Sequence, residues 1–224
     1  MSNNAVVIGV SGGMDSATVL GYYATRGYKV YPLFFSYGSK HNKWELISAK
    51  KLTEYYCTEE LKIVDLSFIG KLFKSNLLQD QGEIPEGHYE AENMSLTVVP
   101  GRNSIFISIM AGYAESVGAN VVAVGTHQGD HLIYADCRPA FISSANTMVQ
   151  LSSGEKVHIE TPVQNLDKTG ILKMGYAFGK QVPYNLTRTC YCDQEFSCGK
   201  CGSCSERLEA FQNIGKIDPI RYAD

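Results

Sequence analysis

Short apolar runs alternate along the chain with segments whose apolar residues recur every three or four positions. The first run, 5–10, is continuous and rich in β-branched residues, and it ends in a Ser-Gly-Gly turn before a helical pattern that reaches Gly27. A continuous apolar run is typical of a strand buried on both faces, and the longer spacing is typical of a helix with one apolar side. The chain is therefore predicted to begin with a strand, a tight turn and a helix.

The same alternation continues through most of the sequence. Further strands are predicted at 30–35, 61–66, 121–124 and 158–161, and further helices at 44–55, 104–117 and 168–178. Strands that alternate with helices need crossover connections, which produce a parallel sheet. We therefore predict an α/β fold, with a parallel sheet that carries helices on both faces.

Composition and charge narrow the class of protein. Of the 224 residues, 44% are hydrophobic and 19% are charged, which is typical of a globular chain. The formal net charge of -3 gives no overall basic surface for nucleic acid, so no direct nucleic-acid partner is expected. No apolar stretch approaches the roughly 20 residues of a spanning helix and no secretion signal is visible, so a cytoplasmic protein without membrane contact is expected.

The amino-acid composition of the chain changes after Pro183, where cysteines become frequent. Five of the seven cysteines fall within 190–204, and a short helical pattern at Leu208 and Phe211 follows them. We predict two units, a nucleotide-binding domain at 1–185 and a small metal-bound lobe at 186–224.

Between 76 and 93 lie five acidic residues with no Lys or Arg. This segment is either a solvated surface loop or a lid over a site.

The turn Ser11-Gly12-Gly13-Met14-Asp15-Ser16 lies where free backbone N–H groups at a helix start favour an anion. It lacks the Gly-Lys-Ser/Thr ending of a Walker A loop and the glycine spacing of a dinucleotide fingerprint. Phosphate is the expected ligand. Asp15 is expected to cap the helix or to help hold Mg²⁺. The alternative is a plain glycine turn with a Ser or Asp cap.

The cysteines Cys198, Cys201 and Cys204 are each separated by two residues, and Cys190 or Cys192 supplies a fourth thiolate. Four thiolates form a closed tetrahedral zinc site, which is structural rather than catalytic. An iron–sulfur cluster is the rival interpretation, but the ferredoxin pattern does not continue after the third cysteine.

Taken together, several motifs resemble one family. They are the Ser-Gly-Gly-x-Asp-Ser loop, the segments 99–103 and 136–141, and the terminal Cys-Gly-x-Cys-x-x-Cys followed by Arg207. The loop is similar to that of ATP-pyrophosphatases, and the whole set, from about 5 to 211, resembles the 7-cyano-7-deazaguanine synthase family of queuosine biosynthesis. The resemblance implies an adenine-nucleotide-α-hydrolase-like, Rossmann-like fold. It also implies ATP-dependent conversion of 7-carboxy-7-deazaguanine and ammonia to the nitrile through an acyl-adenylate and an amide, and a homodimer.

The same resemblance implies roles for individual residues and the cofactors ATP, Mg²⁺ and Zn²⁺. Catalytic roles fall to Ser11, Asp15, Ser16, Arg102 and Lys168, with Lys168 near the departing pyrophosphate. The nucleotide segment is Val10, Ser11, Gly12, Gly13, Met14, Asp15, Ser16, Ala17, Thr18, Val19 and Leu20. The substrate residues are Arg102, Asn103, Asp130, Tyr134, Asp136, Arg138 and Phe141, and the zinc ligands are Cys190, Cys198, Cys201 and Cys204.

Each of these roles has a structural alternative. Lys168 is otherwise a surface lysine at a helix start, Arg102 and Asn103 otherwise brace a loop, and Asp136 and Arg138 otherwise form a salt bridge. His127 and His131 receive no catalytic role.

Two positions depart from the family pattern. Ala135 and Ala140 stand where members usually have Pro and Glu, and the missing Glu would lie near the substrate. A ligase that stops at 7-amido-7-deazaguanine is therefore an alternative function. A tRNA-thiolating enzyme and a zinc-bearing ATP sensor without turnover are two others.

Overall fold

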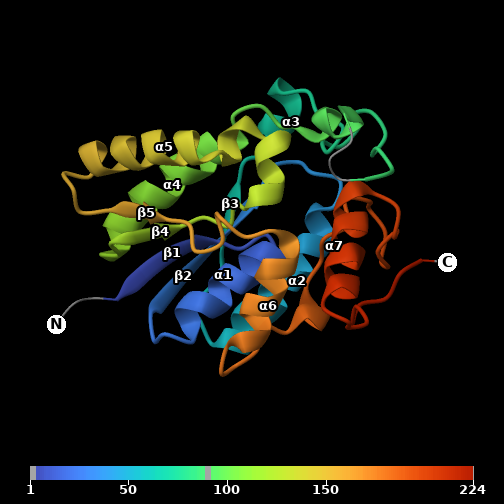
Figure 1. The fold of residues 1–224 in the computed structure, drawn as a ribbon. Helices are drawn as coiled ribbons and strands as arrows, with labels where there is room; N and C mark the ends of the chain where they lie inside the picture. Colours follow the sequence, from blue (N-terminus) through green and yellow to red (C-terminus); the bar gives the residue numbers. More distant parts are fainter. Residues whose placement is uncertain (1–3, 89–91, 224) are drawn as a thin grey trace.

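A five-stranded parallel sheet forms the centre of the computed structural model, which describes residues 4–88 and 92–223 (Figure 1). The strands are β1 (Ala5–Gly9), β2 (Lys29–Ser36), β3 (Lys62–Asp65), β4 (Val121–Ala123) and β5 (His158–Glu160). Their order is β3-β2-β1-β4-β5, so the direction of winding reverses between β1 and β4. In open α/β sheets this reversal leaves a crevice at the carboxyl ends of the strands, where ligands bind.

Helices cover both faces of the sheet (Figure 1). One face carries α1 (Met14–Ala24), α2 (Asn42–Tyr56) and α6 (Lys168–Ala177), with α7 (Gly202–Asn213) packed beside α6. The other face carries α4 (Arg102–Val117) and α5 (Pro139–Ser152). The remaining helices are short: α3 (Ile69–Leu72), η1 (Glu92–Thr97), η2 (Gln128–Leu132), η3 (Ala135–Cys137) and η4 (Tyr184–Leu186).

The central strand β1 builds a core on each side of the sheet. Val6 and Ile8 belong to the core beneath α1, α2 and α6, whereas Ala5 and Val7 belong to the core beneath α4 and α5. Successive side chains of a strand point to opposite faces, so the continuous apolar run is what two covered faces require. The predicted parallel α/β class is confirmed.

Every strand and helix predicted from spacing is present, with ends shifted by a few residues. Helix α5 was not predicted from the sequence. Its buried residues Ile142, Ala145 and Val149 have helical spacing, and Pro139 stands in its first turn. Both are signals of a helix start and of one buried side, so this helix was recognisable.

The acidic segment 76–93 contacts the cysteine-rich part of the chain. Glu86 forms an isolated antiparallel bridge with Cys201, and Gly87 N donates to Lys200 O at 3.0 Å. Lys40 Nζ donates to three backbone carbonyls of this segment. Glu90 lies outside the described residues. The segment is thus fixed to the rest of the molecule at several points rather than only solvated. Among the described residues, no helix has the length and apolar character needed to cross a membrane.

Candidate active site and cysteine cluster

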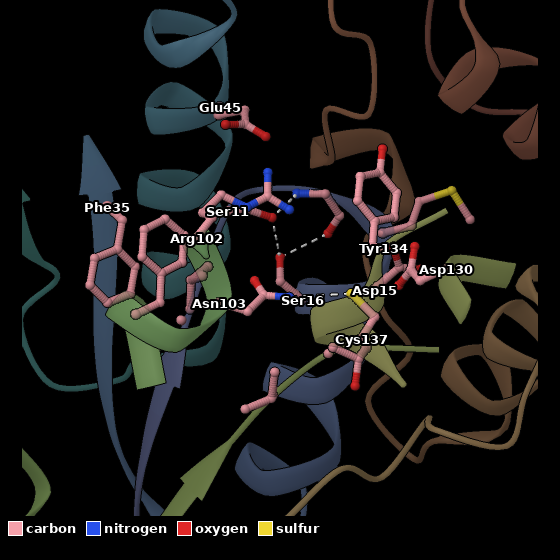
Figure 2. Close-up of a pocket in the computed structure, with 18 of the residues that line it drawn as sticks. Ser11, Asp15, Ser16, Phe35, Glu45, Arg102, Asn103, Asp130, Tyr134 and Cys137 are labelled. Carbon is pink, nitrogen blue, oxygen red and sulfur yellow. Dashed lines mark hydrogen bonds between the residues drawn. The ribbon is translucent and has the colours of Figure 1, made fainter. Parts of the chain in front are cut away.

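A pocket opens at the carboxyl ends of β1, β2 and β4, where the winding reverses (Figure 2). Its apolar part is lined by Phe35, Phe106, Ile107 and Met110, and the rings of Phe35 and Phe106 stack with centroids 4.1 Å apart. In Figure 2, Phe35 lies on one side of the pocket and Tyr134 on the other. Ser11, Ser16 and Arg102 lie between them, and Asp15 and Asp130 lie beside Tyr134, so the pocket is apolar at the Phe35 end and polar elsewhere.

The glycine turn lies between the apolar and polar parts of the pocket. Ser11 Oγ lies 3.0 Å from Ser16 Oγ and accepts from Gly13 N at 3.3 Å. Gly12 has a φ of +87°, a value that favours glycine. Gly13 is the N-cap of α1 and makes no side-chain cap bond, so no Ser or Asp caps this helix. The plain cap that the sequence allowed is therefore wrong, and the helix start is left with N–H groups available to an anion.

Asp15 does not cap α1 either, because its carboxylate binds Lys168. Lys168 Nζ donates to the two carboxylate oxygens of Asp15 at 2.8 and 2.9 Å and lies 3.0 Å from His127 Nε2. Glu206 Oε2 lies 3.2 Å from the same nitrogen. Lys168 is 6% exposed, so the alternative of a surface lysine is wrong.

The neighbouring charged groups determine the protonation states of Asp15 and Lys168. Burial alone would raise the pKa of Asp15, but the Lys168 ammonium and His127 outweigh it and hold that pKa below the ordinary value. Burial alone would lower the pKa of Lys168, whereas Asp15 and Glu206 raise it above the ordinary value. A carboxylate and an ammonium therefore face each other beside the loop at neutral pH.

Four predicted substrate residues line the pocket: Arg102, Asn103, Asp130 and Tyr134. Arg102 begins α4, and its Nη1 lies 3.4 Å from Tyr37 Oη. Tyr134 Oη lies 2.7 Å from Thr97 Oγ1. Asn103 also braces a loop as its structural alternative required, because its Nδ2 donates to Asp136 O at 3.1 Å.

The other three predicted substrate residues do not line this pocket. Asp136 Oδ2 accepts from Asn103 N at 3.0 Å, at the start of α4. Arg138 is exposed and donates from Nε to His131 O at 2.9 Å, and no Asp136–Arg138 ion pair forms in the described chain. Phe141 packs against the core beneath α4 and α5. Five residues of the predicted nucleotide segment do not line the pocket. Gly12 packs against α2, and Ala17, Thr18, Val19 and Leu20 of α1 are buried.

The structure adds pocket residues that the sequence analysis did not identify: His41, Glu45, Arg188, Tyr191 and Ser203. Burial raises the pKa of Glu45 to about 8 against the opposing effect of Arg102 and Arg188. Burial also lowers the pKa of His41 to about 4. No local pattern marks these residues, since they reach the pocket from α2 and from the cysteine-rich segment. The approach of His127 and Glu206 to Lys168 was also not predicted, because each lies far from Lys168 in the sequence.

The sulfur atoms of Cys190, Cys198, Cys201 and Cys204 all lie within 4.8 Å of one another. Sulfur atoms of a tetrahedral Zn–S site are about 3.8 Å apart, and Cys198 Sγ and Cys204 Sγ are separated by 4.0 Å. Backbone N–H groups donate to the sulfurs, as Cys198 N does to Cys190 Sγ at 3.3 Å. Cys192 is not part of this group, although both cysteines were candidates for the fourth ligand. The donor set fits a metal that prefers four thiolates.

Comparisons with known proteins agree with this picture. A family model described as "Queuosine biosynthesis protein QueC" matches residues 4–215. A relative from Colwellia psychrerythraea named 7-cyano-7-deazaguanine synthase 2 is 47% identical, over 97% of this chain and 98% of its own. A Psychromonas ingrahamii relative named 7-cyano-7-deazaguanine synthase is 46% identical over the full length of both chains.

Solved structures extend the comparison to the fold. An NMN synthetase from Francisella tularensis has a TM-score of 0.55 at 18% identity, and the match covers 96% of this chain and 79% of that one. This similarity shows a shared fold. With a family model across nearly its whole length and relatives near half identity, the chain belongs to the QueC family of queuosine biosynthesis proteins.

Proposed function

We propose that this protein is an ATP-dependent 7-cyano-7-deazaguanine synthase, which converts 7-carboxy-7-deazaguanine and ammonia to the nitrile and releases AMP and pyrophosphate. The full-length similarity to proteins of that name carries the proposal. The pocket supports it, because a glycine turn at a helix start adjoins both an apolar cleft and a polar chamber.

ATP would span the two ends of the pocket. The apolar part beside Phe35 and Met110 suits the adenine ring, and the helix start at Ser11 and Ser16 suits the phosphates. Lys168 would stabilise the charge that develops on the departing pyrophosphate. The carboxylate of Asp15 suits Mg²⁺, which would neutralise phosphate charge when bound with ATP.

The substrate would occupy the polar chamber. The fixed guanidinium of Arg102 suits its carboxylate, while Asp130 can accept from ring N–H and amino groups. Asp136 would act through Asn103, whose backbone and side chain it holds, instead of touching substrate. Arg138 and Phe141 would shape the same loop.

The chemistry follows from the need for a leaving group. A carboxylate oxygen attacks the α-phosphorus of ATP, pyrophosphate departs, and an acyl-adenylate forms. Ammonia attacks the acyl carbon, and AMP leaves with one oxygen of the original carboxylate to give the amide. The amide oxygen then attacks the α-phosphorus of a second ATP and displaces a second pyrophosphate, and loss of AMP with that oxygen, together with two protons, leaves the nitrile. One site serves twice, because both steps activate an oxygen on the same carbon.

The four-cysteine cluster would hold Zn²⁺ as a structural ion. Four thiolates leave no open coordination position for a substrate, and because all four come from the lobe 186–224, the ion would hold that lobe together.

Amide formation alone is the second candidate, because the family Glu is replaced by Ala140. Ala135 and Ala140 are both exposed and neither lines the pocket, whereas Glu45 and Asp130 do. The pocket therefore keeps its carboxylates, and we favour the complete synthase.

The experiment is incubation of zinc-loaded protein with 7-carboxy-7-deazaguanine, Mg²⁺-ATP and ammonium, followed by mass spectrometry of the base. The proposal expects the nitrile together with AMP. Amide as the final product would establish the second candidate, and absence of turnover would exclude both.

A further inference from the structure

Helix α7 contacts the cysteine cluster and the loop region at the same time. Cys204 lies in its first turn and belongs to the four-cysteine cluster. Glu206 follows two residues later, and its Oε2 lies 3.2 Å from Lys168 Nζ. Residues two apart in a helix point about 200° apart. The two side chains therefore leave opposite sides of α7, one toward the cluster and one toward Lys168.

Glu206 is closely packed, and its buried Oε2 forms the ion pair with Lys168 without a hydrogen bond among the described residues. Its side chain is 15% exposed, and a Cβ at Gly129 would lie 2.7 Å from its Oε1. The carboxylate therefore occupies space that a side chain at 129 would need. The next residue, Arg207, is fully buried and donates to both carboxylate oxygens of Asp218 at 2.6 and 2.8 Å. Arg207 also donates from Nη2 to Tyr184 O at 3.1 Å, so it links α7 both to η4 and to the segment that follows α7.

The ammonium of Lys168 has partners on the loop side and on the α7 side. Asp15 lies on the loop helix α1, and His127 lies just before η2. Glu206 is the partner that comes from α7. Without the Glu206 carboxylate, the remaining partners would draw the ammonium toward the loop side alone. The position of Lys168 therefore depends on the position of α7.

We propose that Glu206 is a positioning residue that couples metal occupancy of the cysteine cluster to ATP binding through Lys168. The inference rests on the proposed function in that the loop must bind ATP. A metal bound by Cys204 fixes the first turn of α7, and Glu206 then holds Lys168 beside the loop. Coupling between two binding sites is reciprocal, so ATP must tighten metal binding by the same factor by which metal tightens ATP binding.

The test measures this coupling factor in the full chain. Zinc affinity is determined by competition with a chromophoric chelator, with and without Mg²⁺-ATP, for wild type, Glu206→Gln, Glu206→Asp and Glu209→Gln. Glu209 lies on the same helix with its side chain 51% exposed, and is the matched control. We expect ATP to raise zinc affinity about fivefold or more in wild type and Glu209→Gln, and less than twofold in both Glu206 variants.

The proposal is tested by the coupling factor and not by the absolute ATP affinity. Glu206→Gln removes a negative charge, which by itself strengthens binding of the ATP anion whether or not the two sites are coupled. Glu206→Asp keeps the charge but shortens the reach, so it also decides the matter if Glu206→Gln does not fold. An unchanged factor in a folded Glu206 variant, or no coupling in wild type that binds ATP, would overturn the role of Glu206. Failure of wild type to bind Mg²⁺-ATP would instead overturn the proposed function, and this inference with it.

Discussion

Gly12 approaches α2 so closely that a Cβ on it would lie 2.6 Å from the carbonyl oxygen of Glu45. The contact seats the loop against α2, whose Glu45 also lines the pocket, and the φ of +87° adds a second reason for glycine. At Gly13 the backbone is extended, and a Cβ would meet nothing closer than 3.4 Å. The two adjacent glycines therefore differ in how well each position would accept a side chain.

We therefore predict that Gly12→Ala lowers the free energy of unfolding by about 2–4 kcal/mol, through clash and backbone strain. Gly13→Ala is the matched control and should cost less than about 1 kcal/mol. Urea unfolding of both variants measures the difference. Equal losses would show that the approach of Gly12 to α2 is not what the loop requires.

Replacement of Lys168 should impair catalysis far more than binding of the base. Lys168→Met removes the cation beside Asp15, so we expect kcat to fall about 100-fold or more. Lys173→Met on the same helix removes an exposed lysine and should leave kcat within about twofold. Steady-state release of pyrophosphate measures both, and a mild effect of Lys168→Met would remove this residue from the proposed mechanism.

Glu45 should make the fold less stable as the pH rises. His41 Nδ1 donates to Tyr191 O at 3.2 Å, which leaves Nε2 as an acceptor 3.5 Å from Glu45 Oε2. A protonated Glu45 fits this arrangement, in agreement with its pKa of about 8. The unfolded chain loses this proton near its ordinary pKa of about 4.5. Between these two values the folded state binds more protons than the unfolded state, so stability falls with rising pH.

The measurement is the free energy of unfolding of wild type and Glu45→Gln from pH 5 to pH 9. We expect the variant to gain on wild type as the pH rises toward 8, by a few kcal/mol at most. Glu54→Gln, at an exposed position of α2, is the control and should show no such trend. A difference between Glu45→Gln and wild type that stays constant with pH would contradict a buried, protonated Glu45.

The two upstream cysteines should differ in metal retention. Cys190 belongs to the sulfur group and Cys192 does not, so Cys190→Ser should lose most of the bound zinc and Cys192→Ser should keep about one equivalent. Elemental analysis of the purified variants gives the metal content. Iron in place of zinc in the wild type would favour the iron–sulfur cluster alternative.

The features that the sequence predicted are local ones. The strand–turn–helix start, the glycine loop and the cysteine spacing each depend on residues within about fifteen positions, where spacing and chemistry are directly readable. The fold class followed because alternation of strands and helices leaves few topologies. The family resemblance added roles for individual residues, and four of the seven predicted substrate residues line the pocket.

The missed features depend on contacts across long stretches of sequence. Lys168 and Asp15 are 153 positions apart, and no pattern in either segment indicates that Glu206 joins them. His127 received no catalytic role from its sequence context, yet its Nε2 lies 3.0 Å from Lys168 Nζ. Asp136 illustrates the opposite case, since a motif residue suited to substrate binding instead holds the start of α4.

Tracing of the carboxylate oxygens tests the central claim most directly. The protein is supplied with 7-carboxy-7-deazaguanine labelled with ¹⁸O in both carboxylate oxygens, together with Mg²⁺-ATP and ammonium, and AMP and base are analysed by mass spectrometry. Two activations at one site predict nitrile without label and two AMP per nitrile, each with one ¹⁸O. Amide that retains one ¹⁸O, with a single labelled AMP and no nitrile, would contradict the complete synthase, and unlabelled AMP would contradict adenylation of the carboxylate.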